Sequence, residues 1–272
     1  MTQKKNGFVW FVGAGPGAAD LITVRGLTIL KRADVVLYDS LVEPELLELT
    51  DSRKLHVGKR CGRHNYSQEE ISSLMVREAW NGHRVVRLKG GDPAVFGRLG
   101  EEVDALRKYG IPFEIIPGVS SVTASVLACG LSLTKRGIAD SFCVVTGKKA
   151  DSDEPLTIPT YDPRQTIVIL MGVRNFASIR KSMSEQGYPM DIPLCFISRA
   201  GRKDASYIHT NLGSANKKVD ALKDAAPTII LVGHIAQDLE TEIDYFSPES
   251  MGNSPRLWTE PDKTGIKVSS PT

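Results

Sequence analysis

The sequence predicts an α/β fold made of two α/β domains. Short runs of β-branched and apolar residues alternate with segments whose apolar residues recur at helical spacing. Several of these runs end in a glycine-rich turn, which is where open α/β sheets place their ligand contacts. A connector at 133–137 divides the pattern. We therefore expect an N-terminal α/β domain over residues 1–133, a C-terminal α/β domain over 134–246 and a proline-rich, disordered tail over 247–272.

Each expected element follows from a local pattern. Ser67 and Glu70, for example, have the spacing of a capping box and predict the start of a helix. The expected strands are 8–12, 35–38, 85–88, 113–116, 142–145, 167–171, 194–197, 206–210 and 229–232. The expected helices are 20–30, 43–49, 67–79, 101–109, 121–129, 176–186 and 212–223.

The composition excludes several classes of protein. A net charge of +2 is far below that of a dedicated nucleic-acid binder, and no apolar run reaches the length of a membrane span. Four cysteines without CxxC spacing and five scattered histidines predict neither a disulfide framework nor a metal site. We expect a cytoplasmic protein that binds no metal, nucleic acid or membrane.

Residues 13–18 form a glycine turn directly after the first strand and fit the pattern GxGxxA. Asp39 ends the next apolar run, where a dinucleotide-binding domain carries an acidic residue for a ribose. Pro16 argues against that interpretation, because it stiffens the turn where backbone amides would meet a pyrophosphate. Asp39 is therefore either a ribose ligand, a structural carboxylate at a strand end, or a residue with another role in the site.

The stretch 85–102, VVRLKGGDPAVFGRLGEE, is the centre of the predicted ligand site. Gly90 and Gly91 let the backbone turn sharply and approach a ligand, and Asp92 follows at once. An ordinary strand-to-helix turn with an aspartate cap is the alternative. Ser120 and Ser121 follow another strand and can likewise cap a helix or hydrogen-bond a ligand.

Basic residues are concentrated in one region. Residues 53–98 contain ten lysines and arginines against four acidic residues, although the whole chain carries only +2. Several of them lie on the glycine-rich loop 58–64 rather than along one helix face. A solvated basic surface is one explanation, but this placement favours an anionic ligand.

Together these motifs resemble the uroporphyrinogen-III C-methyltransferases, a family of tetrapyrrole methylases. The matching stretches are 12–17, 38–42, 58–64, 85–102, 117–121, 134–137 and 171–172. The resemblance covers about residues 8–245. It implies two α/β domains of the tetrapyrrole methylase type, with S-adenosylmethionine bound in the cleft between them, and a homodimer.

The resemblance also implies an activity and a set of site residues. The activity is C-methylation of uroporphyrinogen III at carbons 2 and 7 to give precorrin-2, for sirohaem or cobalamin biosynthesis, with Asp39 as catalytic residue. The implied cofactor residues are Pro16, Gly90, Gly91, Asp92, Val95, Ser120, Ser121, Met171, Ala200 and Thr228. The implied substrate residues are Lys59, Arg60, Arg63, His64 and Arg98. A nicotinamide-dependent oxidoreductase and a non-catalytic tetrapyrrole or adenosyl-ligand sensor are the alternatives.

Overall fold

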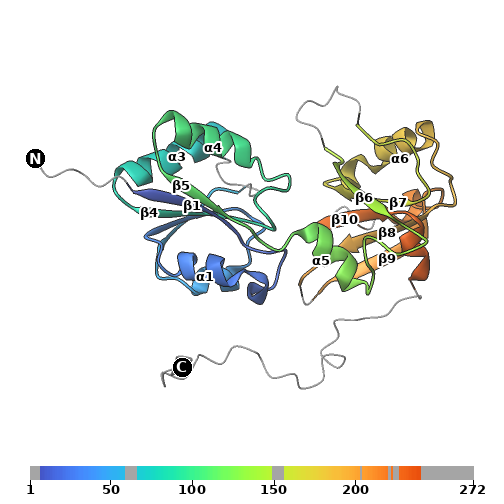
Figure 1. Ribbon diagram of the computed structural model, residues 1–272, viewed down its shortest axis with the longest axis horizontal. Helices are drawn as coiled ribbons and strands as arrows, with labels where there is room; N and C mark the ends of the chain where they lie inside the picture. Colours follow the sequence, from blue (N-terminus) through green and yellow to red (C-terminus); the bar gives the residue numbers. More distant parts are fainter. Residues whose placement is uncertain are drawn as a thin grey trace, which may run out of the picture.

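In the computed structural model the chain forms two lobes, each built around a five-stranded sheet (Figure 1). The structure describes residues 7–58, 66–148, 156–202, 204–219, 222 and 227–239. The predicted tail therefore lies outside the described residues. None of the helices in the described ranges is both long and apolar enough to cross a membrane.

The first sheet is entirely parallel, with strand order β3-β2-β4-β1-β5. Its strands are β1 (Phe8–Gly13), β2 (Val35–Tyr38), β3 (Arg53–His56), β4 (Arg84–Lys89) and β5 (Phe113–Ile116). The central strand β4 is buried along almost its whole length, as expected of a parallel strand covered on both faces. Because the five strands are parallel, their carboxyl ends all lie at the same edge of the sheet, and the turns that follow the strands converge there.

Helices cover both faces of the first sheet (Figure 1). α1 (Val24–Leu30) and the short α2 (Pro44–Glu48) pack on one face, and α3 (Gln68–Trp80) and α4 (Leu99–Lys108) pack on the other. α3 begins with the predicted capping box, in which the Ser67 hydroxyl accepts from the Glu70 amide and the Glu70 carboxylate accepts from the Ser67 amide.

The second sheet is mixed, with strand order β6-β7-β10-β8-β9. Its strands are β6 (Ser141–Thr146), β7 (Gln165–Leu170), β8 (Pro193–Ser198), β9 (Ser206–Asn211) and β10 (Thr228–Val232). Only β6 and β7 run parallel, and the other neighbours are antiparallel. α6 (Phe176–Glu185) and α7 (Asn216–Val219) cover one face, and α5 (Ser121–Ala128) covers the other. Short 3₁₀ turns occupy Ala19–Leu21, Val173–Asn175 and His234–Asp238.

Most expected elements are confirmed, and two expectations need correction. The expected strands all exist, and β3 is an additional one. β3 escapes prediction because it is a half-exposed edge strand of sequence RKLH, without a run of apolar residues. The expected helix 212–223 begins only at Asn216, because residues 212–215 instead form hydrogen-bonded turns after β9. It is described as far as Val219, and residues 220, 221 and 223 lie outside the described residues.

The packing of α5 bears on the division into domains. Val122 and Val126 of this helix pack with Cys195 and Leu231 of the second sheet, rather than with the first sheet. The expected boundary at 133/134 assigns α5 to the first domain. We propose that the boundary lies instead at 117–120, between β5 and α5.

Candidate active site

The glycine turns of the first lobe pack against one another at the carboxyl edge of its sheet. A Cβ on Gly118 would lie 2.4 Å from the carbonyl oxygen of Gly91 and 2.7 Å from the Cα of Gly13. Real Cβ atoms do not approach backbone atoms so closely, so only glycine allows this contact. The turns after β1, β4 and β5 therefore form one unit, which we call the glycine junction (Gly13, Gly91 and Gly118).

A backbone bridge strengthens the glycine junction. The amide of Gly91 donates to the carbonyl of Gly15 at 2.7 Å, and the amide of Gly15 donates to the carbonyl of Gly91 at 3.3 Å. The Gly15 amide is thus engaged within the protein. Moreover, α1 begins only at Val24, so the turn does not open onto a helix N-terminus as a dinucleotide fingerprint requires. Both observations disfavour the dinucleotide interpretation.

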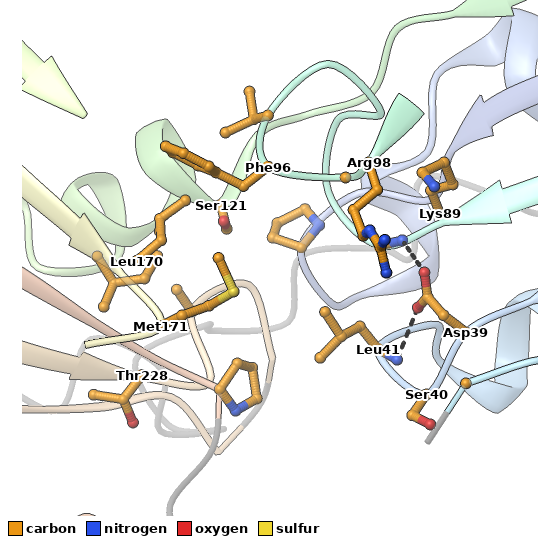
Figure 2. A pocket seen from close by; sticks show the side chains of 18 of the residues that line it. Asp39, Ser40, Leu41, Lys89, Phe96, Arg98, Ser121, Leu170, Met171 and Thr228 are labelled. Atoms are coloured by element: carbon orange, nitrogen blue, oxygen red, sulfur yellow. Dashed lines mark hydrogen bonds between the residues drawn. The ribbon is translucent and has the colours of Figure 1, made fainter. Parts of the chain in front are cut away.

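A cavity of about 420 Å³ opens beside the glycine junction, between the two lobes. This volume is in the range of small-molecule sites. Seven of the residues predicted to bind the cofactor line it: Pro16, Gly90, Val95, Ser121, Met171, Ala200 and Thr228. In Figure 2, Asp39, Lys89 and Arg98 lie on one side of the cavity, and Ser121, Leu170, Met171 and Thr228 lie on the other.

The three remaining predicted cofactor residues do not line the cavity. Gly91 belongs to the glycine junction. Asp92 accepts hydrogen bonds from the backbone amides of Ala94 at 2.8 Å and Gly118 at 2.9 Å. The Ser120 hydroxyl caps α5 by accepting from the Val122 amide at 3.2 Å. These residues therefore shape the cavity wall from behind.

Of the five predicted substrate residues, Arg98 is the one that the structure describes. It lines the cavity, and its guanidinium donates to the Glu101 carboxylate at 2.8 and 2.6 Å. This pairing raises the pKa of Arg98. Lys59, Arg60, Arg63 and His64 lie outside the described residues. Among the described residues, no group of three or more histidine, cysteine and acidic side chains comes together to hold a metal ion.

Asp39 lies at the carboxyl end of β2, on the cavity wall, with its side chain 25% exposed. Oδ1 accepts from the Leu41 amide at 3.0 Å, and Oδ2 accepts from the Gly90 amide at 3.3 Å. The Arg87 guanidinium lies 4.0 Å from Oδ2. These contacts fix the carboxylate beside the Gly90 turn while one part of it faces the cavity (Figure 2).

A buried ion network lies behind the same wall. Glu102 of α4 is fully buried and accepts from Arg87 Nε at 3.0 Å, Lys89 Nζ at 2.7 Å and Gln68 Nε2 at 3.1 Å. Burial alone would raise the pKa of Glu102, but the charges of Arg87 and Lys89 outweigh it and hold the pKa below its ordinary value. Burial and the nearby Arg87 lower the pKa of Lys89.

Comparison with known proteins places this architecture in a family. The profile of the tetrapyrrole (corrin/porphyrin) methylases matches residues 9–216. The chain belongs to this family. A uroporphyrinogen-III C-methyltransferase of Methanocaldococcus jannaschii is 40% identical over 87% of this chain and 99% of its own length. A sirohaem synthase of Nitrosospira multiformis is 37% identical over 93% of this chain and 54% of its own length.

The fold comparison agrees with this assignment. The crystal structure of a uroporphyrin-III C-methyltransferase of Thermus thermophilus, in complex with S-adenosylhomocysteine, has a TM-score of 0.72 and 38% sequence identity. The match covers 85% of this chain and 99% of that chain. The two-domain α/β prediction is thereby confirmed. The chain spans about half the length of the sirohaem synthases that it matches.

Sequence reasoning missed several lining residues of this tetrapyrrole methylase. Arg87 and Lys89 belong to the stretch 85–102, but Arg87 is predicted only as part of the strand 85–88, Lys89 has no predicted role, and Gln68 is predicted only as part of the helix 67–79. A signal was present for the first two, since charged residues inside an otherwise apolar strand are rare without a partner. The partner, Glu102, lies 13 to 15 residues further along the chain, on a helix.

Backbone strain is concentrated around the cavity of this methylase. Among the described residues, the non-glycine positions with positive φ are Phe96, Arg98, Met171 and Arg199. The first three line the cavity, and Arg199 precedes the lining residue Ala200. Conformations of this kind cost of order 1 kcal/mol or more each and persist where the surroundings enforce them, commonly at ligand sites.

Proposed function

We propose that this chain is a methyltransferase that uses S-adenosyl-L-methionine to methylate uroporphyrinogen III at carbons 2 and 7, giving precorrin-2. The observation that carries the proposal is the composition of the cavity of about 420 Å³ between the lobes. It is lined by Gly90, Ser121 and Met171, which come from three separate motifs, and by Asp39 on the side opposite Ser121 and Met171 (Figure 2). The names of the relatives from Methanocaldococcus jannaschii and Thermus thermophilus support the substrate class.

The residues present fit S-adenosylmethionine. The wall formed by the second lobe is mainly apolar, with Leu170, Ile197 and Ile229, which suits an adenine ring and a methionine chain. Ser121 and Thr228 add hydroxyl groups for hydrogen bonds. At Gly90 even a Cβ would lie 2.7 Å from the Leu41 side chain, so the absence of a side chain keeps the cavity open between them.

The substrate side of the cavity is the side of Asp39 and Arg98. Uroporphyrinogen III carries acetate and propionate carboxylates, for which an arginine is the natural hydrogen-bonding partner. We assign this role to Arg98 and, from the sequence, to Lys59, Arg60, Arg63 and His64. Asp39 faces the macrocycle. Its carboxylate accepts a hydrogen bond from a pyrrole N–H and stabilises the positive charge that develops on the ring.

S-adenosylmethionine supplies a sulfonium methyl group, which an electron-rich pyrrole carbon takes while the electron pair of the broken C–S bond stays on sulfur. The ring acquires a positive charge at the pyrrole nitrogen and then loses a proton. The protein's part is to hold the two reactants in line and to exclude water, for which effective molarities of order 10⁵ M or more are available. Asp39 lowers the energy of the charged ring and can accept the proton.

A direct assay tests the proposal. The purified protein is incubated with uroporphyrinogen III and S-adenosylmethionine under exclusion of oxygen, and the product is analysed by mass spectrometry and carbon NMR. We expect the mass of two added methyl groups and their attachment at carbons 2 and 7. Tight binding of NAD without methylation would favour the oxidoreductase alternative. Tetrapyrrole binding without turnover would favour the sensor.

We also propose that the protein acts as a cytoplasmic homodimer in sirohaem or cobalamin biosynthesis. Exposed apolar side chains on α5 and on the edge strand β6 support an interface between copies, with Leu127 69% and Phe142 47% exposed. Light scattering on the purified protein would give a mass twice that of the chain. A charged substitution at Leu127 should shift that mass toward the monomer.

A further inference from the structure

The ion network behind the cavity wall has no role in the mechanism described above. Arg87 and Lys89 lie on the same face of β4, and each has a side chain only 5% exposed. Both line the cavity, as does Gln68, whereas Glu102 lies behind them and does not. Glu102 therefore holds three cavity residues from a position where it touches no ligand.

The charges in this region are balanced. Two buried cations are costly unless carboxylates compensate them. Glu102 provides one compensating charge, and Asp39, with Oδ2 4.0 Å from Arg87, provides the other. Because Glu102 is fully buried and Asp39 is partly exposed to the cavity, Asp39 is the one of these two carboxylates that can meet a substrate.

We propose that Glu102 is a positioning residue for the methyl transfer. It holds Arg87 and Lys89 in place and so sets the electrostatic field in which the Asp39 carboxylate acts on the pyrrole. This inference rests on the proposed function, because it assigns Glu102 a part in that same reaction. Lys89 has a further structural role, since a Cβ on Gly97 would lie 3.1 Å from its Cε. The aliphatic part of the Lys89 side chain thus packs against the loop that contains Phe96 and Gly97.

The proposal has a consequence for the dependence of turnover on pH. Burial and Arg87 lower the pKa of Lys89, and the charge of Glu102 acts in the opposite direction. Removal of that charge should let Lys89 lose its proton at a lower pH. Among the residues that the structure describes, the other titratable or charged groups near Asp39 are Arg87 beside it, Arg98 on the cavity wall, and His56, which hydrogen-bonds the neighbouring Ser40 at 3.0 Å.

The test compares Glu102→Gln with Asp104→Asn, a control on the same helix whose side chain is 75% exposed. Methylation by the parent protein is measured first, since its absence would remove the proposed function itself. In Glu102→Gln we expect kcat to fall at least tenfold, S-adenosylmethionine affinity to stay within threefold, and the alkaline limb of kcat to move to lower pH. Asp104→Asn should behave as the parent.

Lys89→Met is the second variant, and it keeps the proposal testable if Glu102→Gln does not fold. Glu102 retains Arg87 and Gln68 as partners in Lys89→Met, so the fold should survive. We expect its kcat to fall at least tenfold with the alkaline limb lost, and the double variant to be no slower than Lys89→Met. Parent-like kcat and an unmoved limb in either folded variant would overturn the role of Glu102. A loss of cofactor affinity equal to the loss of kcat would overturn it as well.

Discussion

The carboxylate of Asp92 accepts a hydrogen bond from the backbone amide of Gly118 at 2.9 Å and so ties the turn after β4 to the turn after β5. Its second oxygen accepts from the Ala94 amide at 2.8 Å. Both acceptor sites thus serve the protein itself. The geometry of the cavity wall should therefore depend on Asp92, because it holds these two turns together.

Asp92→Asn tests this relationship. Asparagine keeps the volume but carries a single acceptor oxygen, so either the exposed Ala94 amide or the part-buried Gly118 amide loses its partner. We expect the free energy of unfolding to fall by about 1–3 kcal/mol, and S-adenosylmethionine affinity to fall with it. Urea denaturation and calorimetry measure the two effects. Asp162→Asn is the control, because Asp162 accepts a similar bond from Arg164 on an exposed turn of the second lobe. Equal effects of the two substitutions would contradict the prediction.

Gly91→Ala separates backbone strain from loss of ligand binding. Gly91 has φ +69°, and a Cβ there would point toward the Ser121 amide at 3.8 Å, beside the cavity. Gly110 is the matched control, with φ +64° and nothing within 4 Å of a Cβ. Both alanine variants should lose similar stability, roughly 1–2 kcal/mol. Only Gly91→Ala should lose more than tenfold in S-adenosylmethionine affinity, about 1.4 kcal/mol. Parent-like affinity in Gly91→Ala would remove this loop from the cofactor site.

Asp39→Asn distinguishes a catalytic carboxylate from a ribose ligand. We expect near-parent affinity for S-adenosylmethionine and no measurable binding of NAD by either protein. The methylation rate should fall roughly tenfold to a thousandfold, or about 1.4 to 4 kcal/mol of transition-state stabilisation. Calorimetry and single-turnover kinetics provide the measurements. If the variant turns over like the parent, Asp39 is a structural strand-end carboxylate.

Arg98 and Glu101 offer two substitutions with opposite expected effects. Arg98→Ala removes a cation from the cavity and should raise the KM for uroporphyrinogen III severalfold. Glu101→Gln removes the carboxylate that pairs with the Arg98 guanidinium. Because Arg98 is then free to bind a substrate carboxylate, the KM for uroporphyrinogen III should fall at low ionic strength. Both differences should shrink as salt is added, because screening weakens contacts between exposed charges. A KM that moves in the same direction in both variants would show that Arg98 does not bind the substrate.

Asp34 gives the stability of the first lobe an acid dependence. Its carboxylate accepts from Arg84 Nε at 3.1 Å and Nη2 at 2.7 Å, and this bonding lowers the pKa of Asp34 below 3.8. A lowered carboxyl pKa stabilises the fold above the unfolded-state value, and the contribution is lost as pH falls through the folded-state value. The stability difference between the parent and Asp34→Asn should thus be constant near neutral pH, begin to shrink as the pH falls below about 4, and vanish once the pH is below the folded-state pKa. Denaturation curves across this range check the sign.

The sequence by itself determined the alternation of strands and helices and the motifs of the site. The reason is local: β-branched runs favour strands, Ser67 with Glu70 encodes a helix start, and the glycines permit turns that other residues do not. The family resemblance implied ten cofactor residues, and seven of them, including Pro16, Gly90 and Met171, line the cavity. Edge strand β3 carries no such signal, since its half-exposed residues need not be apolar.

Only the tertiary structure decided which motifs meet and which charges are buried together. The contact between Gly13 and Gly118 joins residues 105 positions apart, and no local pattern encodes it. The sequence predicts that Arg87 lies in a buried strand. It does not predict that Arg87 pairs with Glu102, because that pairing depends on how α4 packs on the sheet. The same holds for α5, which follows the first sheet in the chain and packs on the second. A buried polar group is costly unless it is hydrogen-bonded or paired, and which group becomes its partner depends on how the helices pack on the sheets.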